Sequence, residues 1–245
     1  MKADQLQGYL ARSAKDRRLD PFWLLTGSDA FLAVEAGDAI RAEARRQGYT
    51  DRQVLDMNAS ADWSRLPMAA ADIGMFDDRK IVDVRLSTGN PGKNGAPAIV
   101  KYLDNPIDGV VTLITMPAPD WTVTKEAWWG ALQRKATVVD CSPVERAQLP
   151  SWLKARLARH ELVMSPETLD YFADMMEGNL FAAAQEIEKL SLLHPKGEIT
   201  SEQLRQAVSS NARFDFDTLF ESMRLGQADR IVRIIDAVSY THLRA

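Results

Sequence analysis

Cysteine is nearly absent from this sequence of 245 residues, and long apolar runs are missing altogether. The single cysteine, Cys141, excludes an internal disulfide and any zinc site built from several thiolates. No apolar run approaches the roughly 18–20 residues that a membrane-spanning helix needs, and residues 1–20 are charged throughout, unlike a signal peptide. We therefore expect a soluble, cytoplasmic protein without a membrane partner.

A surplus of basic residues is also lacking. Lysine and arginine total 30 against 34 aspartates and glutamates, which gives a net charge of −4. A free-standing nucleic-acid-binding protein normally carries a clear basic excess, so the charge argues against that class. The hydrophobic share of 46% is enough to fill one or two cores and excludes wholesale disorder.

The first 140 residues alternate between strand and helix patterns. Short apolar or β-branched runs predict strands at 22–26, 54–57, 81–84, 110–116 and 136–140. Helical spacing predicts helices after Ser28, around Trp63 to Ala70, and over 125–133, whereas the composition of 87–95 predicts a loop. Such alternation is typical of an α/β domain with a mostly parallel sheet covered by helices.

The helix after Ser28 is expected to be amphipathic, with Ser28 as its N-cap. Its apolar positions, among them Leu32, Ala36 and Ile40, face a core. The opposite face is expected to be solvated and carries Glu35, Asp38, Arg41, Glu43 and Arg45.

Helix signals alone dominate after Pro143, so we place a domain boundary near residue 141 and expect no further strand. One apolar stripe consists of Leu149, Trp152, Leu153 and Leu157. Ser165 and Thr200 are predicted helix N-caps, the second within a capping box. On the helix after Asn179, Glu186, Glu188 and Lys189 are expected to be exposed.

No catalytic site assembles from these residues. The histidines, His160, His194 and His242, fall at two expected helix ends and in the terminal segment, where ordinary solvation explains them. Cys141 follows a strand without a nearby histidine and is interpreted as a buried or incidental thiol.

A phosphate-binding loop of the form G-x-x-x-x-G-K-[S/T] is also missing. The junction between the first strand and the first helix has one glycine, Gly27, no lysine, and Asp29 where phosphate would lie. The strand ending at Met116 runs into Pro117 rather than into acidic residues that could hold Mg²⁺. We therefore expect no bound nucleotide, cofactor or metal, and no catalysis by this chain.

The order and spacing of several segments nevertheless resemble a known family. These segments are 22–32, 75–82, 148–153, 177–180 and 188–191. They are similar to the delta subunit of the bacterial DNA polymerase III clamp loader, a degenerate relative of the AAA+ ATPases that lacks the phosphate loop. The resemblance covers roughly residues 5–237.

The resemblance implies an α/β then all-α architecture. Residues 1–140 would form a Rossmann-like, AAA+-type sheet domain without a P-loop, and 141–211 a small helical lid-type domain. Residues 212–245 would be the truncated start of a helical collar, so that assembly into a loader pentamer is doubtful. The last residues, 238–245, depart from the family pattern and are suspected to be non-native.

The resemblance also implies a function. The chain would bind the ring-shaped sliding clamp and open it for loading onto primed DNA, within a nucleotidyltransferase holoenzyme. The other partners would be the gamma/tau and delta prime subunits, with DNA contacted mainly through the complex and no small-molecule substrate. The family's exposed apolar pair matches Met75 and Phe76, with Ile73 beside them. An apolar tip followed by charge is typical of an anchor in a partner's groove.

One departure and two alternatives remain. Some clamp-binding peptides carry a glutamine five residues before the final aromatic residue, where this chain has Ala71. The first alternative is an ATPase with a divergent phosphate site. The second is a DNA-binding module, suggested by the basic residues Arg12, Lys15, Arg17 and Arg18 and the tryptophans Trp121, Trp128 and Trp129. Solvation and aromatic packing explain the same residues.

Overall fold

The computed structural model describes residues 1–16, 19–72, 79–208, 222–224, 226 and 231–232, without the side chains of 13–16. The contacts divide the chain into two units, Met1–Pro143 and Val144–Ala245. Cys141 belongs to the first unit, where its carbonyl accepts a hydrogen bond from the Asp29 N–H at 3.0 Å.

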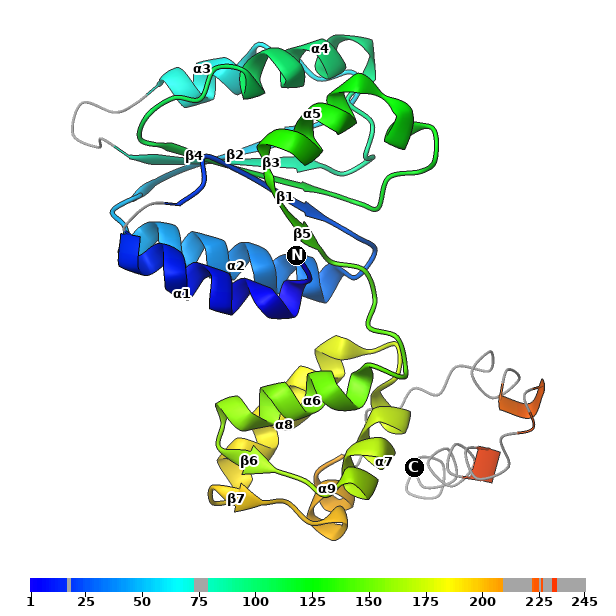
Figure 1. Cartoon of the computed structure of the whole chain (residues 1–245). Helices are drawn as coiled ribbons and strands as arrows, with labels where there is room; N and C mark the ends of the chain where they lie inside the picture. Colours follow the sequence, from blue (N-terminus) through cyan, green and yellow to red (C-terminus); the bar gives the residue numbers. More distant parts are fainter. Residues whose placement is uncertain (17–18, 73–78, 209–221, 225, 227–230, 233–245) are drawn as a thin grey trace. The chain divides into compact units, whose positions relative to one another are not determined.

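The first unit is built on a parallel sheet with helices on both faces (Figure 1). Its strands lie in the order β2-β3-β4-β1-β5. Their bounds are β1 (Phe22–Thr26), β2 (Asp51–Met57), β3 (Lys80–Leu86), β4 (Val110–Met116) and β5 (Thr137–Asp140). The predicted strands 22–26 and 110–116 are confirmed at both ends, because these runs are apolar on both faces, as a covered parallel strand requires.

The helices form one layer on each side of the sheet. Figure 1 shows α1 and α2 on one face and α3, α4 and α5 on the other. Their bounds are α1 (Leu6–Asp16), α2 (Ala30–Arg46), α3 (Arg65–Ala71), α4 (Gly92–Leu103) and α5 (Ala127–Lys135), with short 3₁₀ turns η1 (Ala3–Gln5) and η2 (Val123–Lys125). Helices of both layers connect successive strands. Because the strands are parallel, their carboxyl ends all lie at the same edge of the sheet.

The predicted loop over 87–95 is wrong in its second half, because α4 begins at Gly92. One of the glycines that suggested a loop, Gly95, is required by packing instead. A Cβ on Gly95 would lie 2.3 Å from the Trp63 ring, so the helix can pack against this tryptophan only through glycine. Asn90 prepares the start of the helix, since its side-chain oxygen accepts from the Gly92 N–H at 2.8 Å.

The expected solvated face of α2 is also wrong at two positions. Glu43 is 1% exposed, and its carboxylate pairs with Arg46 at 2.5 Å. The Arg41 side chain is 14% exposed because it reaches a buried carboxylate on β3. Ser28 is not the N-cap: Asp29 is, and its carboxylate accepts from the Leu32 N–H at 2.8 Å.

The second unit consists mainly of helices. They are α6 (Leu149–Arg159), α7 (Pro166–Met176), α8 (Leu180–Leu193) and α9 (Ser201–Ala207). The predicted apolar stripe of α6 is confirmed, because its four residues are all buried. The N-caps are confirmed as well: Ser165 accepts from the Thr168 N–H, and Thr200 forms a capping box with Gln203.

Two details of this unit differ from expectation. A short parallel pair, β6 (Leu162–Val163) and β7 (Gly197–Glu198), stands where no strand was expected, because two residues are too few to show a period. Glu186 is 2% exposed rather than solvated. The Lys189 ammonium reaches back to its carboxylate at 2.7 Å, which allows the charge to be buried.

Most of residues 212–245 lies outside the described part of the chain, including all of 238–245. The collar and the non-native ending therefore stay predictions, as does the assignment of 141–211 as a lid-type domain. Within the described residues, no helix is both long and apolar enough to cross a bilayer.

Candidate functional site

The predicted binding residues Ile73, Met75 and Phe76 lie in the segment 73–78, which is outside the described residues. The residues on either side of this segment are described. Asp72 caps the C-terminus of α3, where its N–H donates to the Met68 carbonyl at 2.9 Å. Arg79 and Lys80 follow the segment, and Lys80 begins β3.

Lys80 joins the two ends of this segment. Its side chain is 4% exposed, and its ammonium donates to the Asp72 carbonyl at 2.7 Å. The same ammonium lies 3.2 Å from a carboxylate oxygen of Asp51, at the start of β2. A buried ammonium needs such partners, because leaving it unpaired in a region without water costs several kcal/mol, on the order of 3–5.

Arg79 attaches the same end of the segment to the C-terminus of α2. Its guanidinium donates to the Gln47 carbonyl and lies 5.6 Å from the centre of the Tyr49 ring. A cation at this end of a helix is favourable because the last carbonyls have no partner within the helix. Arg79 and Lys80 therefore fix the chain where β3 begins.

The junction of β1 and α2 is where a phosphate loop would lie in a nucleotide-binding protein. Here the backbone of residues 141–142 lies against it: a Cβ on Gly27 would be 2.1 Å from the Cys141 carbonyl carbon. The Asp29 N–H donates to the Cys141 carbonyl, and the Asp29 carboxylate occupies the Leu32 N–H. Two amide donors that could face a phosphate are thus used within the protein, and a carboxylate adds negative charge beside them.

The neighbouring strand ends supply structural contacts. The Thr26 hydroxyl donates to the Pro117 carbonyl at 3.2 Å. At the end of β5, the Asp140 carboxylate pairs with the Lys2 ammonium at 2.7 Å and accepts from the Ser142 N–H at 2.9 Å. Burial raises the pKa of Asp140, but these bonds outweigh it and lower the pKa to about 2. Burial, with the charges of Asp140 and Asp29, raises the pKa of the Cys141 thiol to about 12, so the thiol is not an activated nucleophile.

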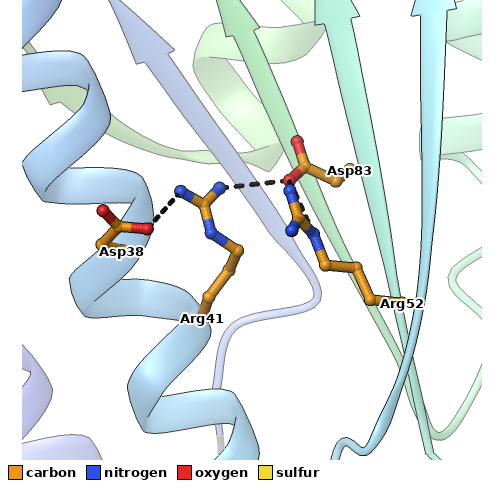
Figure 2. Close-up of polar contacts among 4 residues, drawn as sticks. All are labelled: Asp38, Arg41, Arg52 and Asp83. Atoms are coloured by element: carbon orange, nitrogen blue, oxygen red, sulfur yellow. Dashed lines mark hydrogen bonds and ion pairs between the residues drawn. The ribbon is translucent and has the colours of Figure 1, made fainter.

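A buried ionic cluster crosses from the sheet to α2. Figure 2 shows Asp83 of β3 receiving guanidinium groups from Arg41 of α2 and Arg52 of β2, while Arg41 also reaches Asp38. Asp83 is 1% exposed, and the Arg41 and Arg52 contacts to it each include a 3.1 Å hydrogen bond. Sequence reasoning missed this cluster. The sequence signal for this cluster is Asp83, a charged residue inside a strand that is buried on both faces. A buried charge of this kind needs a partner.

The other candidate groups have ordinary environments. His160 and His194 cap the C-termini of α6 and α8, and His242 lies outside the described residues. Trp128 and Trp129 are buried in the core, as the packing interpretation predicted, whereas Trp121 is 72% exposed with the Lys125 ammonium over its ring. Of the basic residues near the N-terminus, Arg12 is exposed, while the side chains of Lys15, Arg17 and Arg18 lie outside the described part.

A metal site does not assemble in the described part of the chain, where no three histidine, cysteine, aspartate or glutamate side chains gather as ligands would. Directly after the segment 73–78, the side chains of Arg79 and Lys80 each donate to a backbone carbonyl elsewhere in the chain.

Comparison with known proteins shows which family this chain resembles. The family model "DNA polymerase III, delta subunit" matches residues 23–142. The Escherichia coli K12 DNA polymerase III subunit delta is 26% identical over 224 residues, and the match covers 91% of this chain. Over residues 23–142 the chain resembles the DNA polymerase III delta subunit family.

The family match includes the segment 73–78. The Haemophilus influenzae subunit delta is 23% identical over 239 residues and is matched by 95% of this chain. The chain spans 65% of the length of the E. coli family member and 67% of that from H. influenzae.

A solved structure of the family shares the fold. The Bacillus subtilis DNA clamp loader delta protein aligns with a TM-score of 0.66 and 17% identity, over 96% of this chain and 72% of that protein. The predicted α/β architecture followed by helices is therefore confirmed, with the small β6–β7 pair as an addition.

Proposed function

We propose that this chain is a clamp-loader subunit of the bacterial DNA polymerase III holoenzyme, active in the cytoplasm. It binds the sliding clamp and opens the ring for loading onto primed DNA. Its further partners are the gamma/tau and delta prime subunits, and it reaches DNA mainly through the complex. The observation that carries this proposal is the family match over residues 23–142.

The contact with the clamp is assigned to Met75 and Phe76, with Ile73 beside them. Two observations support this assignment. The segment that contains them lies between two fixed points, since the Lys80 ammonium holds the Asp72 carbonyl and Arg79 holds the Gln47 carbonyl. An apolar pair presented from a fixed base loses less conformational freedom on binding than one in a free chain.

Opening the ring requires no chemistry from this subunit. It needs a higher affinity for the open or strained clamp interface than for the closed one, which shifts the population of the ring. We propose accordingly that the chain has no catalytic activity of its own. The Asp29 carboxylate and the close approach of residues 141–142 at the β1–α2 junction support this view, because both disfavour a bound phosphate.

The test is a calorimetric titration of the sliding clamp with the intact chain and with Phe76→Ala. Removing a buried aromatic anchor typically costs about 2–4 kcal/mol, which is roughly 30- to 1000-fold in affinity. The thermal midpoint of the variant is expected to stay close to that of the parent. Met68→Ala is the matched control, because Met68 is a 65% exposed apolar residue on the preceding helix. The affinity of this variant for the clamp should be unchanged.

Two results would contradict the proposal. If Phe76→Ala keeps its affinity and unfolds at a much lower temperature, Phe76 belongs to the core and not to the contact. If the chain alone binds DNA with a steep salt dependence and ignores the clamp, it is a DNA-binding module, for which the exposed Trp121 would be a stacking surface.

A further inference from the structure

In the described part of the chain, β2 lies at the edge of the five-stranded sheet and pairs with β3 alone. The pairing runs residue for residue from Asp51 opposite Lys80 to Met57 opposite Leu86, so this stretch contains no bulge, and it contains no proline. Bulges and proline are two common means of closing a sheet edge to further strands. Among the described residues, no backbone hydrogen bond outside the sheet involves Asp51–Met57. The outer side of β2 therefore presents N–H and C=O groups to which another strand can bond.

The exposed side chains of β2 carry opposite charges on either side of a valine. Arg52, Val54 and Asp56 share one face of the strand, because successive side chains alternate between the two faces. The Arg52 side chain is 36% exposed, Val54 is 38% exposed, and Asp56 is exposed as well. Leu55, on the opposite face, is buried in the core. The exposed face thus carries a base, an apolar residue and an acid at alternate positions.

Both charges of this face are available to a neighbouring strand. Arg52 donates through Nε and Nη2 to Asp83, at 3.1 and 2.5 Å, and Asp83 also accepts from Arg41 (Figure 2). Two guanidinium groups therefore share one buried carboxylate, and the Nη1 of Arg52 has no partner among the described residues. Asp56 forms no ion pair with any residue of the described ranges.

Two copies of β2 complement each other when they pair antiparallel about a two-fold axis. Residues at equal distances from the axis then stand opposite each other, with Cβ atoms about 5 Å apart. With the axis at Val54, Arg52 of each copy stands opposite Asp56 of the other, and the two valines meet on the axis. With the axis at position 52 or 56, like charges would meet instead. Such self-complementarity is what a symmetric dimer interface requires.

We propose that the β2 edge binds a second copy of this chain, as an antiparallel pair of β2 strands centred on Val54. The pairing joins two five-stranded sheets and bonds the outer N–H and C=O groups of both edges. The two Arg52–Asp56 contacts set its register and direction. Two seven-residue strands bury little surface, so the dimer is weak and reversible, with a dissociation constant on the order of 100 µM. The inference does not depend on the proposed clamp contact.

The experiment is sedimentation equilibrium of the intact chain over concentrations from about 5 to 500 µM. We expect Asp56→Arg to weaken the dimer by at least about tenfold, because a cation would then face Arg52 at both contacts. Asp108→Arg is the matched control, because it makes the same change of charge at an exposed residue before β4, away from β2. Amides of β2 should also exchange more slowly as the concentration of the parent chain rises, and should not do so in Asp56→Arg.

A mixture of two variants tests the register. Arg52→Glu alone should weaken the dimer by about tenfold as well, because carboxylates then face each other at both contacts. In an equimolar mixture with Asp56→Arg, each position 52 faces the opposite charge at position 56 of the other chain, so dimers should form again. If Arg52→Glu does not fold beside the buried Asp83, Val54→Lys takes its place. It puts two ammonium groups on the axis and should weaken the dimer by a similar factor.

Several results would overturn the inference. They are a parent chain that stays monomeric at the highest concentration, a dimer that neither Asp56→Arg nor Val54→Lys weakens, and a mixture of folded variants that stays monomeric. If the chain is monomeric and Asp56→Arg weakens clamp binding instead, the β2 edge binds a partner protein and not a second copy. A failure of Phe76→Ala to weaken clamp binding would count against the proposed function alone, because the dimer does not involve that contact.

Discussion

At the scale of single residues, Asp140 shows how a local contact becomes a dependence of stability on pH. Its carboxyl pKa is about 2 in the folded protein, below the ordinary 3.8, because the bonds from Lys2 and Ser142 outweigh the effect of burial. The ionised form therefore stabilises the fold above about pH 3.8. This contribution is lost as the pH falls toward 2.

We predict that Lys2→Met raises the pKa of Asp140, because it removes the hydrogen-bonding cation. The chemical shift of the Asp140 carboxyl carbon, followed from pH 6 to pH 1.5, measures this directly. Both side chains are partly exposed, so the free energy of unfolding at pH 7 should fall by less than about 1 kcal/mol. An unchanged carboxyl titration would show that Ser142 alone lowers the pKa.

At the scale of elements, the close approach of the end of β5 to the end of β1 depends on one glycine. A Cβ on Gly27 would lie 2.1 Å from the Cys141 carbonyl carbon, 2.2 Å from its oxygen and 2.6 Å from the Ser142 nitrogen. All three are backbone atoms of the neighbouring segment, which cannot rotate away as a side chain would. We predict that Gly27→Ala lowers the free energy of unfolding by more than about 2 kcal/mol.

The matched control is Gly8→Ala in α1. A Cβ at Gly8 meets nothing within 4 Å, so alanine should stabilise the helix by roughly 0.5–1 kcal/mol through its higher propensity. Urea unfolding of both variants measures the difference. If both substitutions change the free energy of unfolding equally, the contact between β1 and β5 adjusts easily to a larger side chain. It would then not hold residues 141–142 at this junction.

The elements that the sequence predicts well are those whose pattern is local. The strands 22–26 and 110–116 are apolar runs long enough to be unambiguous, and Ser165 and Thr200 form caps within a few residues. The helix over 92–103 was missed because Gly95 serves a distant packing partner, Trp63, which no local pattern reveals.

The candidate site, too, can be predicted from the sequence only in part. Met75 and Phe76 come from a family resemblance, and an apolar pair beside charge is visible in the sequence. The contacts of Lys80 are not visible in the sequence, since its partners are the Asp72 carbonyl and the Asp51 carboxylate, which is distant in sequence. The buried Asp83 also needs Arg41 and Arg52 from other elements before its charge makes physical sense.

At the scale of the whole molecule, the proposed contact and its supports belong to a single unit. The segment 73–78, to which we assign the proposed clamp contact, falls within Met1–Pro143, as do Lys80, Arg79 and their partners. This unit also has its own core, which includes Leu24, Leu86 and Leu132, none of them exposed. A chain with such a core is expected to fold independently, because its apolar surface is buried by its own residues.

We predict that a fragment of residues 1–143 folds and binds the sliding clamp with the affinity of the 245-residue chain, within about twofold, or roughly 0.4 kcal/mol. Circular dichroism with thermal unfolding tests the folding, and calorimetric titration tests the affinity. Phe76→Ala in the fragment is the control, and it should weaken binding by the same factor as in the whole chain. A fragment that unfolds cooperatively but binds much more weakly would show that residues 144–245 contribute to the clamp contact, because the supports of the segment 73–78 are all retained in it.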